Sequence, residues 1–160
     1  MSRARAAAGS VVFLLLAPGV VVGLIPWSLT GWESDDVWVP IRVLGAILIV
    51  VGVGVLLHAF ARFVVEGIGT PAPVAPTQHL VVGGLYRYVR NPMYLAVIAA
   101  IVGQALLLGQ LELLAYAALV AAAVASFVHW YEEPTLHRQF GDEYDAYRQA
   151  VPGWIPRLRR

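Results

Sequence analysis

The chain has 160 residues, of which 59% are hydrophobic and only 13% are charged, and its formal net charge at pH 7 is +1. Soluble globular domains average roughly 45–50% apolar and about 25% charged residues. A small soluble domain has too much surface to cover with so little charge, so a soluble enzyme, a disordered protein and a nucleic-acid-binding protein are disfavoured. Because cysteine is absent, disulfides, thiolate metal sites and cysteine nucleophiles are excluded. The composition predicts a polytopic membrane protein.

Four apolar segments predict the membrane-spanning helices: residues 10–29, 40–61, 93–108 and 111–128. A span needs roughly 20 apolar residues, with a range of about 17–25, so the first, second and fourth segments are long enough. The third is short, and Gly109-Gln110 joins it to the fourth, which is typical of a helical hairpin. The sequence predicts an all-α fold with four transmembrane helices in one domain, residues 1–160. Residues 1–65 hold two spans, and residues 66–160 hold the loop, the hairpin and the tail.

Arginine placement predicts the orientation in the membrane. Arg3 and Arg5 precede the first apolar segment, as they would in a signal peptide, but the apolar core is longer than the usual stretch of about 7–15 residues and no clear cleavage site follows. Arginines also lie between the second and third segments and after the fourth, and they mark the cytoplasmic side. Arg42 is the exception, and its side chain can snorkel outward. We expect a multi-pass protein of the inner membrane with both termini cytoplasmic.

The central segment, residues 62–91, is rich in glycine and proline yet contains the apolar stretch Leu80-Val81-Val82. A loop of this length is usually functional or disordered, and the apolar residues favour a structured cytoplasmic loop. After Val128 the aromatic and apolar residues recur at helical spacing, which predicts an amphipathic C-terminal helix. Gly141 weakens the middle of that helix and Pro152 ends it.

A first cluster of chemically capable residues, Arg90-Asn91-Pro92, joins the loop to the third apolar segment. A residue before proline avoids helical dihedral angles, so the helix should begin at Pro92 with Asn91 as its N-cap. The free N–H groups of a helix start attract anions, and Arg90 beside them can bind a carboxylate or phosphate through two hydrogen bonds. The alternative is an ordinary cap with a positively charged anchor and interfacial tyrosines.

A second cluster, Glu132-Glu133-Pro134, lies at the end of the fourth apolar segment. Two acids beside a membrane are costly unless they are solvated or paired, so they either bind a cation or hydroxyl groups, or form a solvated pair that ends the span. Pro134 is expected to disturb the helix and to aim the acids inward. His79 either faces a ligand or is a loop residue in water. The sequence holds no motif for a metal site.

The chain carries a series of short motifs in a fixed order: Gly67-Ile68-Gly69-Thr70-Pro71, His79-Leu80-Val81-Val82-Gly83-Gly84-Leu85-Tyr86, Arg87-Tyr88-Val89-Arg90-Asn91-Pro92-Met93-Tyr94, Glu132-Glu133-Pro134-x-Leu136, Phe140-Gly141-x-x-Tyr144-x-x-Tyr147 and Val151-Pro152-x-x-Ile155-Pro156. In this order the motifs resemble those of the isoprenylcysteine carboxyl methyltransferase family and its bacterial members. That family belongs with the phospholipid methyltransferases in a superfamily of membrane methyltransferases. The first two spans match only as hydrophobic helices.

The resemblance implies S-adenosylmethionine as the methyl donor, bound at the cytoplasmic side. Carried over position by position, it implies these cofactor-binding residues: His79, Leu80, Val81, Tyr86, Arg90, Asn91, Pro92, Tyr94 and Glu132. It implies Arg90 and Glu133 as catalytic residues. The eukaryotic enzymes usually have histidine where this chain has Asn91, so no role for an imidazole is implied at this position.

The chemistry of the donor agrees with these positions. Arg90 and the helix start suit its carboxylate, while Glu132 and Glu133 suit its amine or ribose. Methyl transfer is an in-line displacement that needs alignment and exclusion of water more than acid–base groups. A carboxylate acceptor is already ionised, whereas an amine or thiol has to lose a proton, which His79 or Glu133 would assist.

The sequence leaves the acceptor open, as a hydrophobic or amphipathic molecule with a carboxylate, an amine or a thiol. The expected partners are the lipid bilayer and this acceptor, with no nucleic acid. Two alternatives remain: a membrane NADPH-dependent reductase related to sterol reductases, which share a related carboxyl-terminal architecture by resemblance, and a catalytically inactive scaffold. Arg90, Glu132 and Glu133 argue against the scaffold.

Overall fold

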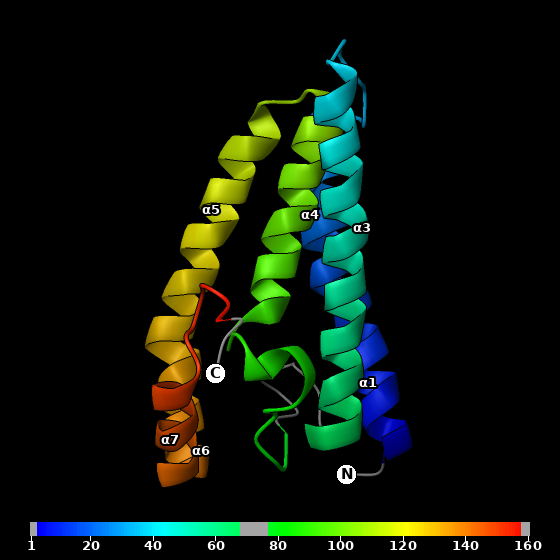
Figure 1. Ribbon diagram of the computed structural model, residues 1–160. Helices are drawn as coiled ribbons and strands as arrows, with labels where there is room; N and C mark the ends of the chain where they lie inside the picture. Colours follow the sequence, from blue (N-terminus) through cyan, green and yellow to red (C-terminus); the bar gives the residue numbers. More distant parts are fainter. Residues whose placement is uncertain (1–2, 68–76, 158–160) are drawn as a thin grey trace.

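The computed structural model describes residues 3–67 and 77–157, and every regular element in these ranges is helical (Figure 1). The predicted all-α fold is therefore confirmed for this part of the chain. In chain order the elements are α1 (Arg3–Leu16), η1 (Val20–Leu24), α2 (Ile25–Thr30), α3 (Val39–Arg62), η2 (Phe63–Gly67), η3 (Gly84–Arg87), α4 (Pro92–Leu108), α5 (Glu112–Phe127), η4 (Val128–Glu132), α6 (Glu133–Phe140) and α7 (Asp142–Ala150). Three of the short elements, η1, η2 and η4, are π turns, and η3 is a 3-10 turn.

The N-terminal helix consists of α1, η1 and α2, and it is long and apolar enough to cross a membrane. This helix begins before residue 10, the predicted start of the first span, because the alanines that follow Arg5 continue the helix toward the N-terminus. Pro26 occupies the first turn of α2, where the segment tolerates a missing amide donor. Gly31 ends the helix in the left-handed region, at φ +59°, and its amide donates to the carbonyl of Trp27 at 2.7 Å.

The most extensive contact between two helices in the described chain joins α3 and α4. Glycines lie at this contact. A Cβ placed on Gly103 would lie 2.7 Å from the carbonyl oxygen of Gly45, and one placed on Gly52 would lie 2.8 Å from that of Ala96. Small residues at such positions let two helix backbones approach closely. The spacing of α3 and α4 is therefore set by backbone contact.

A short link between α4 and α5 confirms the predicted hairpin (Figure 1). Gly109 ends α4 at φ +76°, and its amide donates to the carbonyl oxygen of Ala105 at 2.9 Å. Arg42 donates from Nε to the carbonyl oxygen of Leu107 at 3.3 Å. Because the last carbonyls of a helix lack partners within it, this contact gives Arg42 a structural role at the end of the bundle opposite Arg62 and Arg90.

The chain after α5 differs from the predicted single tail helix. α5 does not stop at Val128, the predicted end of the fourth span, but continues through η4 into α6 and ends at Phe140. Pro134 lies in the first turn of α6, and because proline lacks an amide donor, the wider π turn directly precedes it. Gly141 then adopts φ +54°, and the separate helix α7 follows. The prediction of one tail helix is wrong because Gly141 breaks it.

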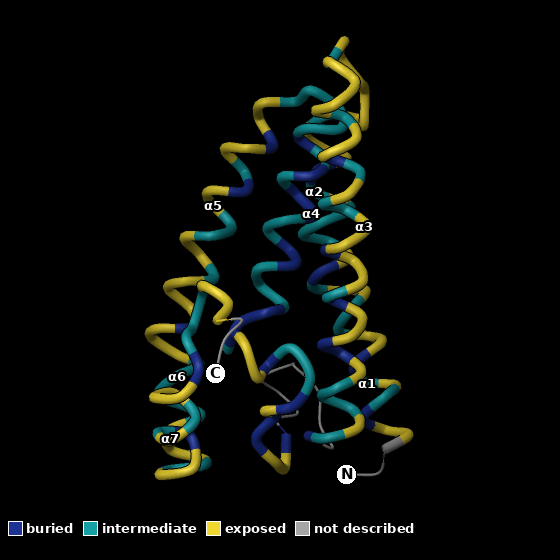
Figure 2. The backbone as a smooth tube through the Cα atoms, viewed as in Figure 1, coloured by how far each residue is buried: buried dark blue, intermediate teal, exposed yellow. Residues whose placement is uncertain are grey.

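Three helical stretches are long and apolar enough to cross a membrane: Ala4–Thr30, Val39–Gly67 and Glu112–Phe140. α4 is apolar but has only 17 residues, so of the four predicted spans three are long enough to cross a membrane and the third is a shorter apolar helix. In the most apolar part of each span, only 6%, 28% and 17% of the residues are buried inside the protein. Exposed residues follow the outward sides of α3 and α5 (Figure 2). An apolar surface of this extent requires lipid, and the chain is a multi-pass membrane protein.

We expect Gly103→Ala to lower the free energy of unfolding by about 1–3 kcal/mol, because overpacking a tight contact costs that much. The new methyl group would meet the backbone of Gly45 and the side chain of Ile49. Unfolding by a denaturing detergent is followed through the loss of helical circular dichroism. Gly54→Ala is the control, since a Cβ there meets nothing within 4 Å and the gain in helix propensity is the same. Equal stability of the two variants would contradict the close contact.

Candidate functional site

A cavity of about 580 Å³ lies at the end of the bundle that carries the loop before α4. Its volume falls within the range of small-molecule sites, roughly 300–1,000 Å³. The walls come from α1, α3, α4, α5, α6, α7, the three π turns and the loop, and most of the lining is apolar. Representative wall residues are Phe13, Leu56, Val97, Val124 and Leu136.

Each of the three π turns in the described chain contributes to the cavity wall. Val21 comes from η1, Phe63 from η2, and Tyr131 and Glu132 from η4. A π turn widens the helix by one residue and redirects the side chains that follow it. Such turns are rare in proteins overall, and those that occur are often found at functional sites. Their convergence on one cavity identifies it as the candidate site.

The start of α4 lies at the cavity, and α4 begins at Pro92 as predicted. Asn91 occupies the N-cap position and is buried, but its side chain forms no capping hydrogen bond. The C-terminal tail holds the backbone here, because the amide of Arg90 donates to the carbonyl of Pro152 at 2.9 Å and that of Asn91 to the carbonyl of Gly153 at 3.2 Å. The tail therefore fixes the position from which the Arg90 and Asn91 side chains reach the cavity.

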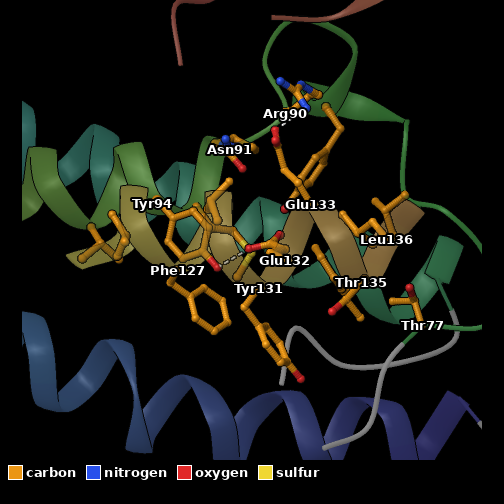
Figure 3. Close-up of a pocket in the computed structure, with 18 of the residues that line it drawn as sticks. Thr77, Arg90, Asn91, Tyr94, Phe127, Tyr131, Glu132, Glu133, Thr135 and Leu136 are labelled. Atoms are coloured by element: carbon orange, nitrogen blue, oxygen red, sulfur yellow. Dashed lines mark hydrogen bonds and ion pairs between the residues drawn. The ribbon is translucent and has the colours of Figure 1, made fainter. Parts of the chain in front are cut away.

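An ion pair joins the start of α4 to the start of α6. Nη1 of Arg90 lies 2.7 Å from Oε1 of Glu133 (Figure 3) and also donates to the hydroxyl of Tyr144 at 3.1 Å. Nη2 of Arg148 lies 3.4 Å from the other oxygen of Glu133. The side chains of Arg90 and Glu133 are only 14% and 15% exposed. Nε of Arg90 is buried without a hydrogen-bond partner, so the guanidinium has a donor left for an anionic ligand.

Glu132 lies beside Glu133 in the sequence but is bound by a different group. The hydroxyl of Tyr94 donates to Oε2 of Glu132 at 2.6 Å (Figure 3). Hydrogen bonds to a carboxylate are short and strong, so this one fixes the carboxylate at the cavity wall. The two acids are thus paired separately with protein groups, which removes the alternative of a solvated pair.

Three tyrosine hydroxyls surround the ionic groups. Burial raises the pKa of Tyr86, Tyr144 and Tyr147 above the ordinary value, and the nearby carboxylates raise it further, Glu132 at Tyr86 and Glu133 at Tyr144. A raised pKa keeps each hydroxyl protonated and neutral at pH 7. The hydroxyl of Tyr147 donates to the carbonyl oxygen of Tyr86 at 2.8 Å. This bond ties α7 to the loop.

The structure brings nearly all of the predicted site residues together. The following line the cavity: Leu80, Val81, Tyr86, Arg90, Asn91, Pro92, Tyr94, Glu132 and Glu133. His79 is exposed and lies outside this set. Within the described ranges, no three histidine or acidic side chains group as metal ligands.

The cavity lining also holds residues that were not assigned from the sequence, among them the polar residues Thr77, Gln139, Tyr144 and Tyr147. The tyrosines belong to the spaced motif after Phe140, and that motif was a signal from which they could have been assigned. Thr77 and Gln139 carried no such signal, because their contact joins distant parts of the chain. Nε2 of Gln139 donates to the carbonyl oxygen of Thr77 at 2.7 Å.

The fold and the site together define a multi-pass helical membrane protein with a small-molecule cavity at one end of the helix bundle. The sequence matches the phospholipid methyltransferase family over residues 40–143, and the chain belongs to this family. It is also similar to the protein-S-isoprenylcysteine O-methyltransferase of Schizosaccharomyces pombe, with 38% identity over 85 residues. The match covers 48% of this chain and 33% of the relative, so the chain corresponds to about a third of that protein. These similarities confirm the resemblance found in the motifs.

We expect Arg90→Ala and Glu133→Ala each to lower the free energy of unfolding by about 3 kcal/mol, because either change removes the ion pair of a largely buried charge. Glu133 then keeps only the 3.4 Å contact with Arg148, or Arg90 only the hydroxyl of Tyr144. The double variant should lose about 1–3 kcal/mol less than the sum of the two. Denaturing-detergent titration measures all three variants. The exposed pair of His137 and Asp145, 3.0 Å apart, is the control, and Asp145→Asn should change stability by less than about 0.5 kcal/mol. Additive effects of the two alanine substitutions would contradict the ion pair.

Proposed function

We propose that this protein is an S-adenosylmethionine-dependent methyltransferase that methylates a hydrophobic or amphipathic acceptor at the cytoplasmic face of the inner membrane. The observation that carries the proposal is that Arg90, Glu132 and Glu133 gather at a cavity with mostly apolar walls. Membership in the phospholipid methyltransferase family supports the reaction class. The donor is charged and the acceptor is apolar, and a cavity with charged groups in apolar walls suits both.

The residues at the cavity fit the donor. When bound, S-adenosylmethionine supplies an activated methyl group on a sulfonium. Arg90 would hold its carboxylate, since the buried Nε lacks a partner and an unsatisfied buried donor costs free energy until a ligand or water binds it. Glu132 or Glu133 would hold its amine or ribose hydroxyls. Asn91 would contribute at the start of α4, where free N–H groups favour an anion.

The protein side chains contribute orientation and exclusion of water. Tyr94 holds Glu132 and Arg90 holds Glu133, and carboxylates fixed in advance stabilise a positive group without having to reorganise. The apolar walls keep water away from the reacting groups. A carboxylate acceptor needs no base, whereas an amine or thiol acceptor would give its proton to Glu133. His79, which lies outside the cavity lining, takes no part in this scheme.

The acceptor and the membrane side are further parts of the proposal. The yeast relative is named for O-methylation of a protein isoprenylcysteine. Because the match covers a third of that protein, carboxylate, amine and thiol acceptors all remain in the proposal.

The start of α1 and the C-terminal tail lie toward the end of the bundle that carries the cavity (Figure 1). Arginines of the described residues concentrate at that end, in α1, at the end of α3, before α4 and in α6 and α7, which supports a cytoplasmic site. The two parts of the chain, residues 1–65 and residues 66–160, line the same cavity, which favours a single domain.

Calorimetric titration of the detergent-solubilised protein tests donor binding. We expect saturable binding of S-adenosylmethionine and of its demethylated product, and no binding of NADPH. Arg90→Lys should weaken donor binding about tenfold or more, because lysine keeps a charge near Glu133 but lacks the planar fork that binds a carboxylate through two hydrogen bonds. Glu132→Gln should weaken it by a similar factor, because it removes a charge-assisted hydrogen bond.

The control for this titration is Arg42→Lys, at the opposite end of the bundle, which should leave the affinity unchanged. Unchanged affinity in both Arg90→Lys and Glu132→Gln would remove the site assignment. Binding of NADPH without S-adenosylmethionine would move the protein to the reductases. Binding of neither molecule by folded protein would favour the inactive scaffold.

A further inference from the structure

One wall of the cavity is formed by the loop before α4. Leu80, Val81 and Tyr86 belong to this loop, line the cavity and are buried. The backbone between them, at Val82 and Gly83, lies against η2, the turn that follows α3. The position of the wall therefore depends on the groups that hold this backbone.

Glu66 supplies the hydrogen bonds that hold it. Its Oε1 accepts a hydrogen bond from the amide of Val82, and its Oε2 accepts one from the amide of Gly83, both at 3.2 Å. Nη2 of Arg62, one turn earlier, lies 2.9 Å from the same Oε2. Glu66 itself does not line the cavity. One carboxylate thus accepts from two consecutive amides while it is paired with Arg62.

The glycine pair Gly83-Gly84 makes this close approach possible. A Cβ on Gly83 would overlap the guanidinium of Arg62 and the carboxylate of Glu66. Gly84 adopts φ +59°, and a Cβ there would lie 2.5 Å from Nε2 of His58. The left-handed φ at position 84 favours glycine, and a side chain at position 83 would displace the ends of the Arg62 and Glu66 side chains. The contact explains a motif that the chemistry of the methyl donor leaves unexplained.

The π turn η2 directs Glu66 toward the loop. η2 continues α3, and its extra residue turns the following side chains away from the course they would take on a regular helix. Phe63, in the same turn, lines the cavity and meets the ring of Tyr86 edge-on, with centroids 5.8 Å apart. The carbonyl of Gly67 accepts a hydrogen bond from the amide of Gln78 at 2.8 Å. This one turn therefore contacts the loop at several points along its length.

We infer that Glu66 is a positioning residue for binding of the methyl donor, because its carboxylate holds the amides of Val82 and Gly83 and thereby keeps the loop in place as a wall of the cavity. The inference rests on the proposed function, in which this cavity holds the donor. Glu66 acts through the backbone that it binds and does not itself touch the ligand.

The test compares Glu66→Gln with the unmodified protein. Glutamine has nearly the same shape, but its carboxamide presents one oxygen and one NH₂ group to two amide donors, so one hydrogen bond is lost. We expect the dissociation constant for S-adenosylmethionine to rise about tenfold. We also expect faster hydrogen–deuterium exchange in the peptide that contains Val82 and Gly83, with unchanged exchange in α4 and α5.

Two controls separate positioning from general stability. Glu112→Gln makes the same change at an exposed carboxylate at the other end of the bundle and should leave donor affinity unchanged. Gly103→Ala lowers stability away from the cavity lining, and it should also bind the donor normally at a temperature where it is folded. If Glu66→Gln does not fold, Glu66→Asp replaces it, since it keeps the charge and shortens the reach by one methylene.

Each outcome decides the inference. Weaker donor binding with local acceleration of exchange supports it. If the unmodified protein and Glu66→Gln bind S-adenosylmethionine equally tightly, the role of Glu66 is overturned and the proposed function stands. If Gly103→Ala loses as much affinity as Glu66→Gln, the loss is a general effect of lower stability and the inference about Glu66 is overturned. Absence of donor binding by the folded unmodified protein overturns the proposed function, and the role of Glu66 with it.

Discussion

The ion pair of Arg90 and Glu133 connects the start of α4 to the start of α6, across a separation of 43 residues in the chain. Either charge alone would be costly in this largely buried setting, so the pair requires the two helix starts to meet. Tyr144 and Arg148 bring α7 into the same network. The cavity is bounded by the elements that meet there, and its polar character comes from this junction.

The π turns meet two requirements at once: continuous backbone hydrogen bonding in the membrane and redirected side chains at the cavity. In lipid, backbone amides and carbonyls must be bonded within the helix, so a spanning helix cannot be interrupted to aim a side chain at a ligand. A π turn keeps the helix continuous while it redirects the following residues. η1, η2 and η4 extend or interrupt the three long apolar helices in this way, and each one contributes to the cavity wall. The apolar walls come mainly from these helices, while the loop and tail hold the polar groups.

Much of the fold was predictable because it depends on local properties of the chain. Hydrophobicity and length identified the apolar helices, Gly109 identified the hairpin, and Pro92 identified the start of α4. The order of short motifs also identified Arg90 and the two acids, Glu132 and Glu133, as site residues, and they do line one cavity. His79 was selected by the same motifs, yet it is exposed, because a sequence motif does not specify which way a loop side chain faces.

By itself, the sequence determined the membrane class, the positions of the helices and the family, since composition, hydrophobic length and motif order are properties of the linear chain. Only the tertiary structure decided the pairing of Arg90 with Glu133, of Tyr94 with Glu132 and of Glu66 with the loop. Their partners lie 43, 38 and 16–17 residues away, and no local rule relates residues at such distances. The continuation of α5 through η4 into α6 was also decided there, and it places Glu132 beside Tyr94 and Glu133 beside Arg90.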